Sequence, residues 1–280
     1  MRKWFAVIGD PIEQSMSPKM HNSWFIENEI DATYIPIHVS KADLKEAVMS
    51  LKRLGCSGWN VTVPHKTAII PFLDHIDPSA KIMNAVNTVE VLSDGTLRGS
   101  NTDGIGFVRS LEEAFPGQLD NKKVLIIGAG GAARGIAFAL QESNYGPIAF
   151  TNRTIEKALE LSSELLGSTA MSIESAEASL QEYGLIIQTT SVGMNFSQQG
   201  VPLNPENLAE GSIVADIIYN PLETELLTKS LERNALTMNG TGMFVHQGAF
   251  AFEKWHGIQP NTEKMIEKIT ITLGGSYVNR

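Results

Sequence analysis

Cysteine is almost absent from this sequence, and that excludes two kinds of stabilising chemistry. Cys56 is the single cysteine among 280 residues, so the chain forms neither an intrachain disulfide nor a cluster of cysteine ligands around a metal. No pair of the six histidines has metal-ligand spacing, and we expect no metal site. A lone cysteine is most often a small buried apolar side chain, which is what we expect of Cys56.

Long apolar runs and an excess of basic residues are missing too. No stretch approaches the roughly 20 apolar residues of a membrane span, and the amino-terminal apolar run is too short for a signal peptide. The formal net charge of −9 disfavours a nucleic acid held by general electrostatics. We therefore expect a cytoplasmic protein that binds a small molecule and neither a membrane nor a nucleic acid. The sequence leaves a homodimer open.

The first hundred residues alternate between patterns typical of strands and of helices. Residues 3–9, 32–39 and 57–63 are predicted strands, separated by predicted helices over 17–28 and 41–55. Ser17 and Ser40 are the expected caps of these helices. This order predicts a mostly parallel α/β sheet. Asp94-Gly95, between two extended runs, then predicts a hairpin.

A second unit begins with a predicted helix from residue 103 and with the sequence KKVLIIGAGGAARG. Its predicted strands cover 124–127, 147–154, 185–190 and 212–219, and two helices close the chain. We predict an α/β protein of two domains. Residues 1–103, completed by helices over about 243–280, form the first, and residues 104–242 form a second domain of Rossmann type.

The glycine turn of the second unit predicts dinucleotide binding. Gly128, Gly130 and Ala133 match G-x-G-x-x-G/A directly between a strand and a helix. This context supplies a tight turn, backbone that can approach a pyrophosphate, and a helix amino terminus that offers N–H groups. The residues expected around the pyrophosphate are Gly128, Ala129, Gly130, Gly131, Ala132 and Ala133.

The end of the next strand favours NADP over NAD. In NAD sites an acidic residue about 20 positions past the first glycine binds the ribose hydroxyls. Here that strand ends in TNRT and has no acid. A guanidinium binds a 2′-phosphate through paired hydrogen bonds, whereas a carboxylate would repel it. The expected contacts are Arg153 and, one helical turn further, Lys157.

Small polar residues follow several strands of the first domain. Because ligand sites of α/β sheets form beyond the carboxyl ends of strands, these side chains are expected to converge. Each also has an ordinary interpretation as a helix cap, a turn residue or a solvated lysine. His65, beside Lys66, is expected at the surface. The residues are Ser15, Ser17, Asn60, Thr62, Lys66, Asn87 and Asp103.

Several motifs together resemble the shikimate dehydrogenase family. They are SMSP, NVTVPHK, AVNT, NTDG, GAGGAAR with NRT, and GMFVHQGAFAFEKW, in the family's order over nearly the whole chain. The resemblance implies a substrate domain and an NADP domain facing each other across a cleft. It also implies the reversible, NADPH-dependent reduction of 3-dehydroshikimate to shikimate in aromatic amino-acid biosynthesis.

The resemblance further implies a role for individual residues. Lys66 and Asp103 would be the catalytic acid–base pair. The substrate carboxylate would lie on Ser15 and Ser17, with Tyr219 closing over it. Ring hydroxyls would be bound, or the catalytic pair positioned, by Asn60, Thr62, Asn87 and Gln247. The nicotinamide half of the cofactor would lie along Thr190, Ile217, Gly240 and Met243. Asn152 and Thr154 would join Arg153 and Lys157 around the 2′-phosphate.

Two departures from the family pattern and three alternatives stay open. Glu13-Gln14 stands where Gly-His is usual, and Met83-Asn84 where Ile-Gly is usual; both bear on loop shape and substrate affinity. One alternative is a quinate/shikimate dehydrogenase with relaxed NAD or NADP use. A second is methylenetetrahydrofolate dehydrogenase, which lacks this motif set as a group. The third is a non-catalytic NADP sensor, which need not keep Lys66 with Asp103.

Overall fold

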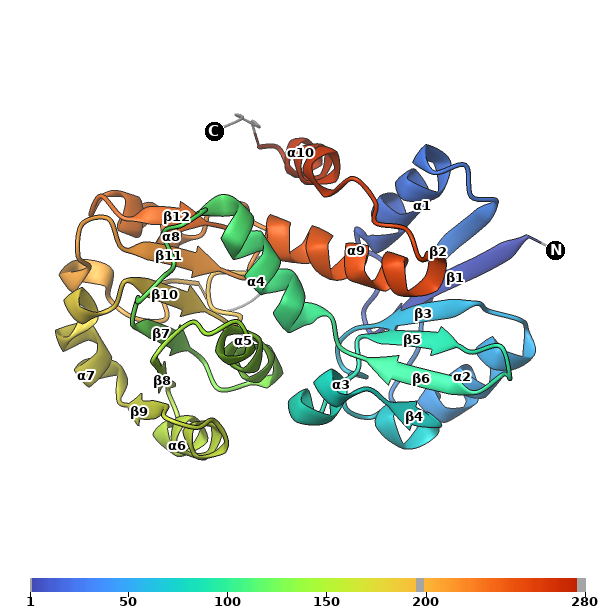
Figure 1. The fold of residues 1–280 in the computed structure, drawn as a ribbon, viewed down its shortest axis with the longest axis horizontal. Coiled ribbons are helices and arrows are strands. Elements are labelled where there is room, and N and C mark those ends of the chain that lie inside the picture. Colours follow the sequence, from blue (N-terminus) through green and yellow to red (C-terminus); the bar gives the residue numbers. More distant parts are fainter. Residues whose placement is uncertain (1, 195–198, 276–280) are drawn as a thin grey trace. The chain divides into compact units, whose positions relative to one another are not determined.

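The computed structural model describes residues 2–194 and 199–275, and its contacts divide the chain into two compact units. Unit 1 combines Met1–Asp103 with Val245–Met265, and unit 2 combines Gly104–Phe244 with the chain from Ile266 onward. Each unit contains one six-stranded sheet (Figure 1). Across the described residues, no helix has the length and apolar character needed to cross a membrane.

The sheet of unit 1 has the strand order β2-β1-β3-β5-β6-β4. Its strands are β1 (Lys3–Gly9), β2 (Ala32–His38), β3 (Gly58–Val61), β4 (His75–Ile76), β5 (Thr88–Val91) and β6 (Leu97–Ser100). β1 runs parallel to both neighbours, and β5 antiparallel to both of its own. The hairpin predicted at Asp94-Gly95 is confirmed: it joins β5 to β6, and Gly95 has a φ of +81°.

Helices cover both faces of this sheet. They are α1 (Ser17–Glu27), α2 (Leu44–Arg53), α3 (Pro78–Met83) and the unit 1 part of α9 (Thr241–His256), with the 3-10 turn η1 (Ile70–Phe72). α2 packs Leu44, Val48 and Leu51 against Trp59 on one face. On the other face Phe5 of β1 contacts α1 and α9, with its ring 5.6 Å from Phe25 and 4.9 Å from Trp255.

Both predicted helix caps in unit 1 are wrong. The cap position of α1 is Met16, and Ser17 is already helical. α2 begins only at Leu44, after Asp43, and the Ser40 hydroxyl donates a 2.6 Å hydrogen bond to the Asp43 carboxylate. The serine therefore stabilises the turn before the helix and leaves the helix N–H groups alone.

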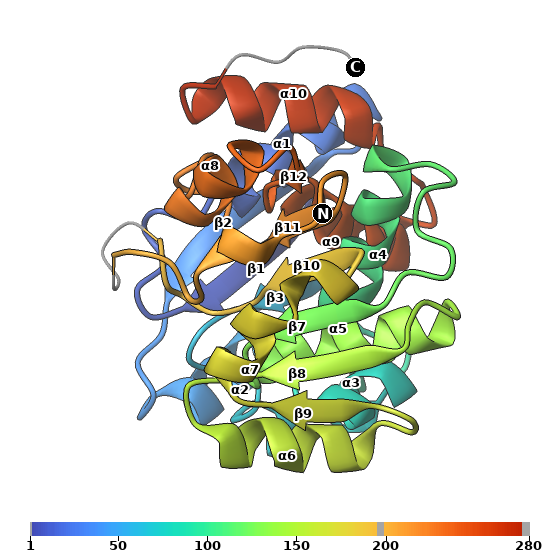
Figure 2. The same cartoon turned by 90° about the vertical axis from the view of Figure 1, so that its left-hand side faces the viewer.

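The sheet of unit 2 is entirely parallel, with the order β12-β11-β10-β7-β8-β9 (Figure 2). When β7 is numbered 1 and the sheet is read from β9 to β12, this is the doubly wound order 3-2-1-4-5-6. The strands are β7 (Val124–Ile127), β8 (Ile148–Thr151), β9 (Thr169–Met171), β10 (Leu185–Gln188), β11 (Ile213–Asp216) and β12 (Leu236–Met238). The order reverses between β7 and β10, where ligands bind in this topology.

Two apolar layers enclose the sheet of unit 2. α4 (Asp103–Ala114), α5 (Gly131–Glu142) and α6 (Ile155–Glu164) contribute to the core on one face. α7 (Ile173–Ala178) and α8 (Glu225–Leu231) contribute to the core on the other. The 3-10 turns η2 (Leu180–Glu182) and η3 (Pro205–Asn207) and the helix α10 (Thr262–Thr272) complete the described elements.

Candidate active site

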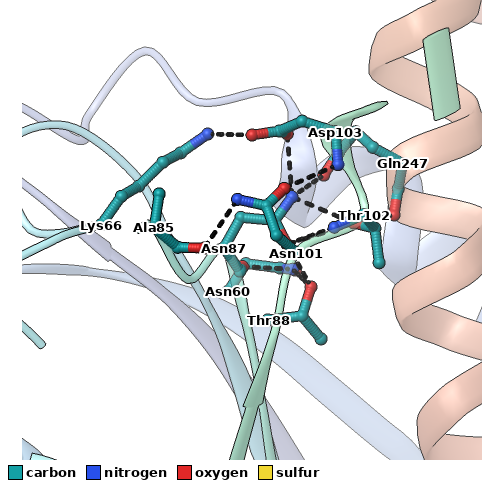
Figure 3. Close-up of polar contacts among 9 residues, drawn as sticks. All are labelled: Asn60, Lys66, Ala85, Asn87, Thr88, Asn101, Thr102, Asp103 and Gln247. Carbon is teal, nitrogen blue, oxygen red and sulfur yellow. Dashed lines mark hydrogen bonds and ion pairs between the residues drawn. The ribbon is translucent and has the colours of Figure 1, made fainter. Parts of the chain in front are cut away.

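Polar side chains of unit 1 gather around the ends of β3, β5 and β6 (Figure 3). Asn60 lies in β3, and Lys66 in the loop that follows it. Asn87 immediately precedes β5, Asp103 lies just after β6, and Gln247 comes from α9. The structure thus brings together five residues predicted from sequence, from segments far apart in the chain.

Lys66 and Asp103 form an ion pair at the centre of this cluster. Lys66 Nζ lies 2.6 Å from Asp103 Oδ2, and the two side chains are 30% and 14% exposed. Asp103 Oδ1 accepts a 2.8 Å hydrogen bond from Asn87 Nδ2. Each carboxylate oxygen therefore has its own donor, while the ammonium group remains partly accessible to a ligand.

A tight turn after β3 places Lys66. The His65 N–H donates to Thr62 O at 2.9 Å, and the Lys66 carbonyl accepts from Val86 N at 2.8 Å. The prediction that His65 lies at the surface is wrong. It is fully buried, and its Nε2 lies 2.7 Å from Val39 O, so this nitrogen carries the proton. Val63, in contrast, is 67% exposed, because β3 ends at Val61 and the predicted alternation of buried and exposed side chains does not extend to residue 63.

Asn87 connects several residues of the cluster through its side-chain amide. Its Oδ1 accepts from Thr102 N at 3.0 Å and from Thr88 Oγ1 at 2.8 Å. Its Nδ2 donates to Thr102 Oγ1 at 3.0 Å and lies 3.5 Å from Gln247 Oε1. A buried amide with this many partners has one orientation, because a flip would leave several buried polar groups unpaired.

Ser15, Ser17 and Thr62 lie beyond the carboxyl ends of the neighbouring strands β1 and β3. Ser15 Oγ accepts a 3.3 Å hydrogen bond from Ser17 N, at the start of α1. The Thr62 N–H donates to Ile8 O at 3.0 Å, which ties the threonine to the end of β1. All three therefore occupy the edge of the sheet at which a ligand site was predicted.

The glycines after β7 differ in what they do. Gly128 has a φ of +116°, and a Cβ there would overlap the Thr189 hydroxyl, so any other residue would strain the fold. A Cβ at Gly130 or Gly131 would meet no described atom within 4 Å, and the φ of Gly130 is −95°. Ala133 is fully buried against the core.

These properties fit a dinucleotide. Open space above Gly130 and Gly131 lets a pyrophosphate approach the backbone at the amino terminus of α5. Gly130 at the cap position also provides no side chain to satisfy the first N–H groups of that helix. We call the predicted pyrophosphate residues Gly128 to Ala133 the glycine cradle; its open backbone at Gly130 and Gly131 is compatible with such a ligand.

The residues expected at the 2′-phosphate follow β8 directly. Asn152 Nδ2 donates to Thr154 O at 2.9 Å and closes a turn. Arg153 and Lys157 are exposed, and within residues 2–194 and 199–275 their side chains make no hydrogen bond or ion pair. Arg134, by contrast, is paired with Glu164. The two cations after β8 are thus available to an anionic ligand.

The residues expected along the nicotinamide lie after β10, β11 and β12. Thr190 N donates to Gln188 Oε1 at 2.8 Å, and Ile217 N donates to Gln188 O at 3.1 Å. Gly240 packs so closely on the Ile217 carbonyl that a Cβ would overlap it. Met243 is largely buried in the core of unit 2.

Tyr219 and Asp216 belong to the end of β11 and the segment after it. The Tyr219 ring stacks on Phe244 with centroids 4.8 Å apart, and burial raises the pKa of its hydroxyl. Asp216 is fully buried; its Oδ1 accepts from Ile218 N at 2.9 Å and its Oδ2 from Thr224 Oγ1 at 2.8 Å. Burial raises the pKa of this carboxyl to about 6.

Some members of the hydrogen-bond network around Asn87 and Asp103 were not predicted from the sequence. Thr88, Asn101 and Thr102 belong to the AVNT and NTDG motifs, so the motifs themselves carried a signal for them. Tyr34, whose hydroxyl donates to Asn60 Oδ1, carried none, because only its burial and its partner identify it and the sequence shows neither. Among the described residues, no group of three or more His, Cys, Asp or Glu side chains is placed to hold a metal ion.

Family models match both parts of the chain. The shikimate dehydrogenase substrate binding domain matches residues 7–89. The shikimate / quinate 5-dehydrogenase family matches residues 110–217, and the shikimate 5′-dehydrogenase C-terminal domain matches residues 240–270. Lys66 with its loop falls within the first match, and the glycine turn falls within the second.

Individual proteins agree with the family models. The NADP(+) shikimate dehydrogenase of Lysinibacillus sphaericus is 54% identical over 276 residues, which is 99% of this chain and 100% of that one. A crystal structure of shikimate dehydrogenase with NADP+ has a TM-score of 0.89 at 39% identity, covering 97% and 96% of the two chains. The Thermus thermophilus enzyme with NADP(H) and shikimate has a TM-score of 0.87 at 32% identity, covering 95% and 98%. This chain belongs to the shikimate dehydrogenase family.

Proposed function

We propose that this chain catalyses the reversible, NADPH-dependent reduction of 3-dehydroshikimate to shikimate in aromatic amino-acid biosynthesis. The observation that carries the proposal is the Lys66–Asp103 pair, held at 2.6 Å in a buried network within a chain of this family. The same chain has a glycine cradle with two available cations after the next strand. A sensor would need the cradle but not the ion pair.

Residues 1–103, with the helices over about 243–280, form the substrate-binding domain in this proposal, and residues 104–242 form the NADP-binding domain. The division of contacts at Asp103 and at Phe244 supports the first two bounds, whereas the chain from Ile266 onward has its contacts with unit 2 and gives the last part of this division no support. The family models for the substrate domain and for the central region fall on either side of the first boundary.

Lys66 transfers the proton, and Asp103 positions Lys66. Bound NADPH supplies the hydride for the ring carbonyl carbon. As an ammonium, Lys66 stabilises the charge that develops on the carbonyl oxygen and donates the proton to it. In the reverse direction, neutral Lys66 accepts the proton of the substrate hydroxyl. Asp103 accepts a hydrogen bond from Lys66 and fixes where its nitrogen lies.

The other polar residues bind and orient the substrate. Ser15 and Ser17 hold the carboxylate through their hydroxyls, and Tyr219 closes over it. Thr62 and Gln247 contact ring hydroxyls, while Asn60 and Asn87 hold the catalytic pair in place. For Ser15, Ser17, Asn60 and Thr62, the supporting observation is their position at or beyond the carboxyl ends of β1 and β3. For Asn87 and Gln247, it is their contact with each other and that of Asn87 with Asp103.

NADP lies on the second domain. Residues 128–133 hold the pyrophosphate through backbone N–H groups, and Thr190, Ile217, Gly240 and Met243 lie along the nicotinamide half. Asn152, Arg153, Thr154 and Lys157 surround the 2′-phosphate. The absence of a carboxylate at the end of β8 and the exposure of Arg153 and Lys157 support NADP over NAD.

Nicotinamide absorbance tests the proposal directly. Purified protein is given shikimate or quinate with NADP or NAD, in all four combinations. We expect fast reduction of NADP with shikimate and much slower turnover in the other three. Comparable turnover of quinate or NAD would support the broader dehydrogenase, and NADP binding without any turnover would support the sensor.

We also propose a cytoplasmic location and a homodimer. NADPH-driven biosynthesis needs the cell's pool of reduced dinucleotide, which supports the location. The edge strand β2 and the adjacent α1 expose Ile35 and Ile26, at 39% and 79%, which supports an interface there. Light scattering should give about twice the chain mass of 30.5 kDa, and a monomer mass would contradict the dimer.

A further inference from the structure

A buried tyrosine outside every motif is bonded to the network of the active site. Tyr34 lies in β2 and is 1% exposed. Its hydroxyl donates a 2.6 Å hydrogen bond to Asn60 Oδ1. Asn60 Nδ2 in turn donates to Asn87 O at 3.0 Å and to Thr88 Oγ1 at 3.1 Å. Both amide protons of Asn60 are therefore used within the protein.

Backbone groups fix the direction of these hydrogen bonds. The Asn87 carbonyl can only accept, so Asn60 must present its Nδ2 to it and its Oδ1 to the tyrosine. Tyr34 is therefore the donor in its bond to Asn60. Thr88 Oγ1 already accepts from Asn60, so its single proton goes to Asn87 Oδ1 at 2.8 Å.

The direction of the hydrogen bonds at Asn87 is fixed in the same way. The backbone N–H of Thr102 can only donate, and it meets Asn87 Oδ1 at 3.0 Å. Asn87 must then turn Nδ2 toward the Asp103 carboxylate, 2.8 Å away. The protons consequently point one way, from Tyr34 through Asn60, Thr88 and Asn87 to Asp103, which also accepts from Lys66.

Two consecutive residues of α1 hold the tyrosine in place. The His21 ring stacks on Tyr34 with centroids 4.4 Å apart and planes 8° apart. Asn22 accepts from Tyr34 N at 2.9 Å and donates to Tyr34 O at 2.8 Å. Burial lowers the pKa of His21 to about 3 and raises the pKa of Tyr34 well above 10. The stack is thus uncharged, and the hydroxyl stays protonated as a donor.

We propose that Tyr34 is a positioning residue for the reaction, because its hydroxyl orients Asn60 and, through Thr88 and Asn87, the Asp103 carboxylate that pairs with Lys66. This inference rests on the proposed function. It gives His21 and Asn22 of α1 a structural role, since they hold Tyr34 in place. It also assigns Asn60 to orientation of the site, since neither of its donors is left for a ring hydroxyl.

Tyr34→Phe tests the inference, because it keeps the ring and its stack on His21 and removes only the hydroxyl. We expect kcat per NADP-binding site to fall about tenfold, since one buried acceptor is left unpaired, while KM for NADP stays unchanged. The matched control is Tyr183→Phe, a buried tyrosine of unit 2 whose hydroxyl contacts Met171 Sδ at 3.7 Å. Its kcat should match the wild type.

The wild type in the same assay separates the two proposals. An inactive wild type overturns the proposed function and the positioning role with it. An active wild type with an equally active Tyr34→Phe overturns the positioning role alone.

A second pair of variants keeps the test decisive if Tyr34→Phe does not fold. Thr88→Val keeps the side-chain volume and removes the hydroxyl that links Asn60 to Asn87, whereas Thr88→Ser keeps the hydroxyl. We expect a loss of kcat of about tenfold in the valine variant and near wild-type kcat in the serine variant. An equal loss in both would mean that Thr88 acts only by packing, and would overturn the series of hydrogen bonds.

Discussion

The proposed ligand sites of the two units are built in opposite ways. In unit 1 the site is a network of side chains already bonded to one another, centred on Asn87 and Asp103. In unit 2 the corresponding surface is backbone and open space, with Arg153 and Lys157 exposed and Gly130 unobstructed.

The difference follows from what each ligand demands. A proton transfer requires an ammonium and a carboxylate held within tenths of an ångström, and only a bonded network does that before the substrate arrives. A dinucleotide brings its own charge and many contacts, so its site needs room, N–H groups and unpaired cations. Variants in unit 1 should therefore change kcat, and variants in unit 2 should change cofactor affinity.

The largest effect is expected for Lys66→Ala. Removing the group that we propose as the proton donor should lower kcat by about 10²- to 10⁴-fold and change KM for shikimate much less. Steady-state kinetics with NADP and shikimate measures both. Lys45→Ala, at an exposed lysine of α2, is the control and should leave kcat unchanged. Near wild-type turnover in Lys66→Ala would remove this lysine from the mechanism.

Arg153→Glu tests the other side of the comparison. It replaces a cation expected at the 2′-phosphate with a charge that repels it, so KM for NADP should rise about 10- to 100-fold. KM for NAD, which lacks the phosphate, should change far less. Arg109→Glu, at an exposed arginine of α4, provides the matched charge reversal and should affect neither. Equal effects of Arg153→Glu on both cofactors would mean that Arg153 does not contact the phosphate.

The two glycines of the turn should separate stability from binding. Gly130→Ala adds a methyl group to open space at an ordinary φ, so the melting temperature should hold while the Kd for NADP rises. Gly128→Ala should lower stability by more than about 1 kcal/mol, because of its φ of +116° and the overlap with Thr189. Calorimetry gives stability and titration gives Kd. Unchanged NADP affinity in Gly130→Ala would contradict the cradle.

The smallest expected effect is on the pH dependence of stability. The contributions of His21 in unit 1 and Asp216 in unit 2 should change with pH in opposite directions. The pKa of His21 in unit 1 is lowered from 6.5 to about 3, so its contribution to stability is full above pH 6.5 and is lost as the pH falls toward 3. The pKa of Asp216 in unit 2 is raised from 3.8 to about 6, so its contribution is full below pH 3.8 and is lost as the pH rises through 6.

Urea unfolding at pH values from about 4 to 7 measures how the free energy of unfolding changes with pH. Each group contributes a slope of at most about 1.4 kcal/mol per pH unit. His21→Phe should flatten the rise of stability with pH, and Asp216→Asn should steepen it. The same change of slope in both variants would show that one of the two burial arguments is wrong.

Elements with an apolar pattern or a turn motif were predictable from the sequence, whereas the shortest strands were not. β1, β7, α5 and the hairpin at Asp94-Gly95 carry periodicity or turn residues that act locally. β4, β9 and β12 have only two or three residues each, and they form because a neighbouring strand offers hydrogen bonds. Such short segments have no period of their own to detect.

The candidate site divides in the same way. Lys66, Asp103 and the glycine turn are marked by motifs, because their chemistry constrains residue type and spacing. His65 was misplaced, since neither its type nor its spacing shows that the turn after β3 directs its ring to the Val39 carbonyl. Tyr34 was missed, because a tyrosine in a strand is ordinary until a partner such as Asn60 is found beside it.

The sequence by itself determined the α/β class, the glycine turn between β7 and α5, the preference for NADP at the end of β8, and the family. These depend on local spacing and residue type, which a linear pattern contains. Only the tertiary structure decided that Lys66 meets Asp103, that His21 and Asn22 hold Tyr34, and that Asp216 is buried. Burial and hydrogen-bond partners arise when distant segments pack together, and no local pattern records which segments those are.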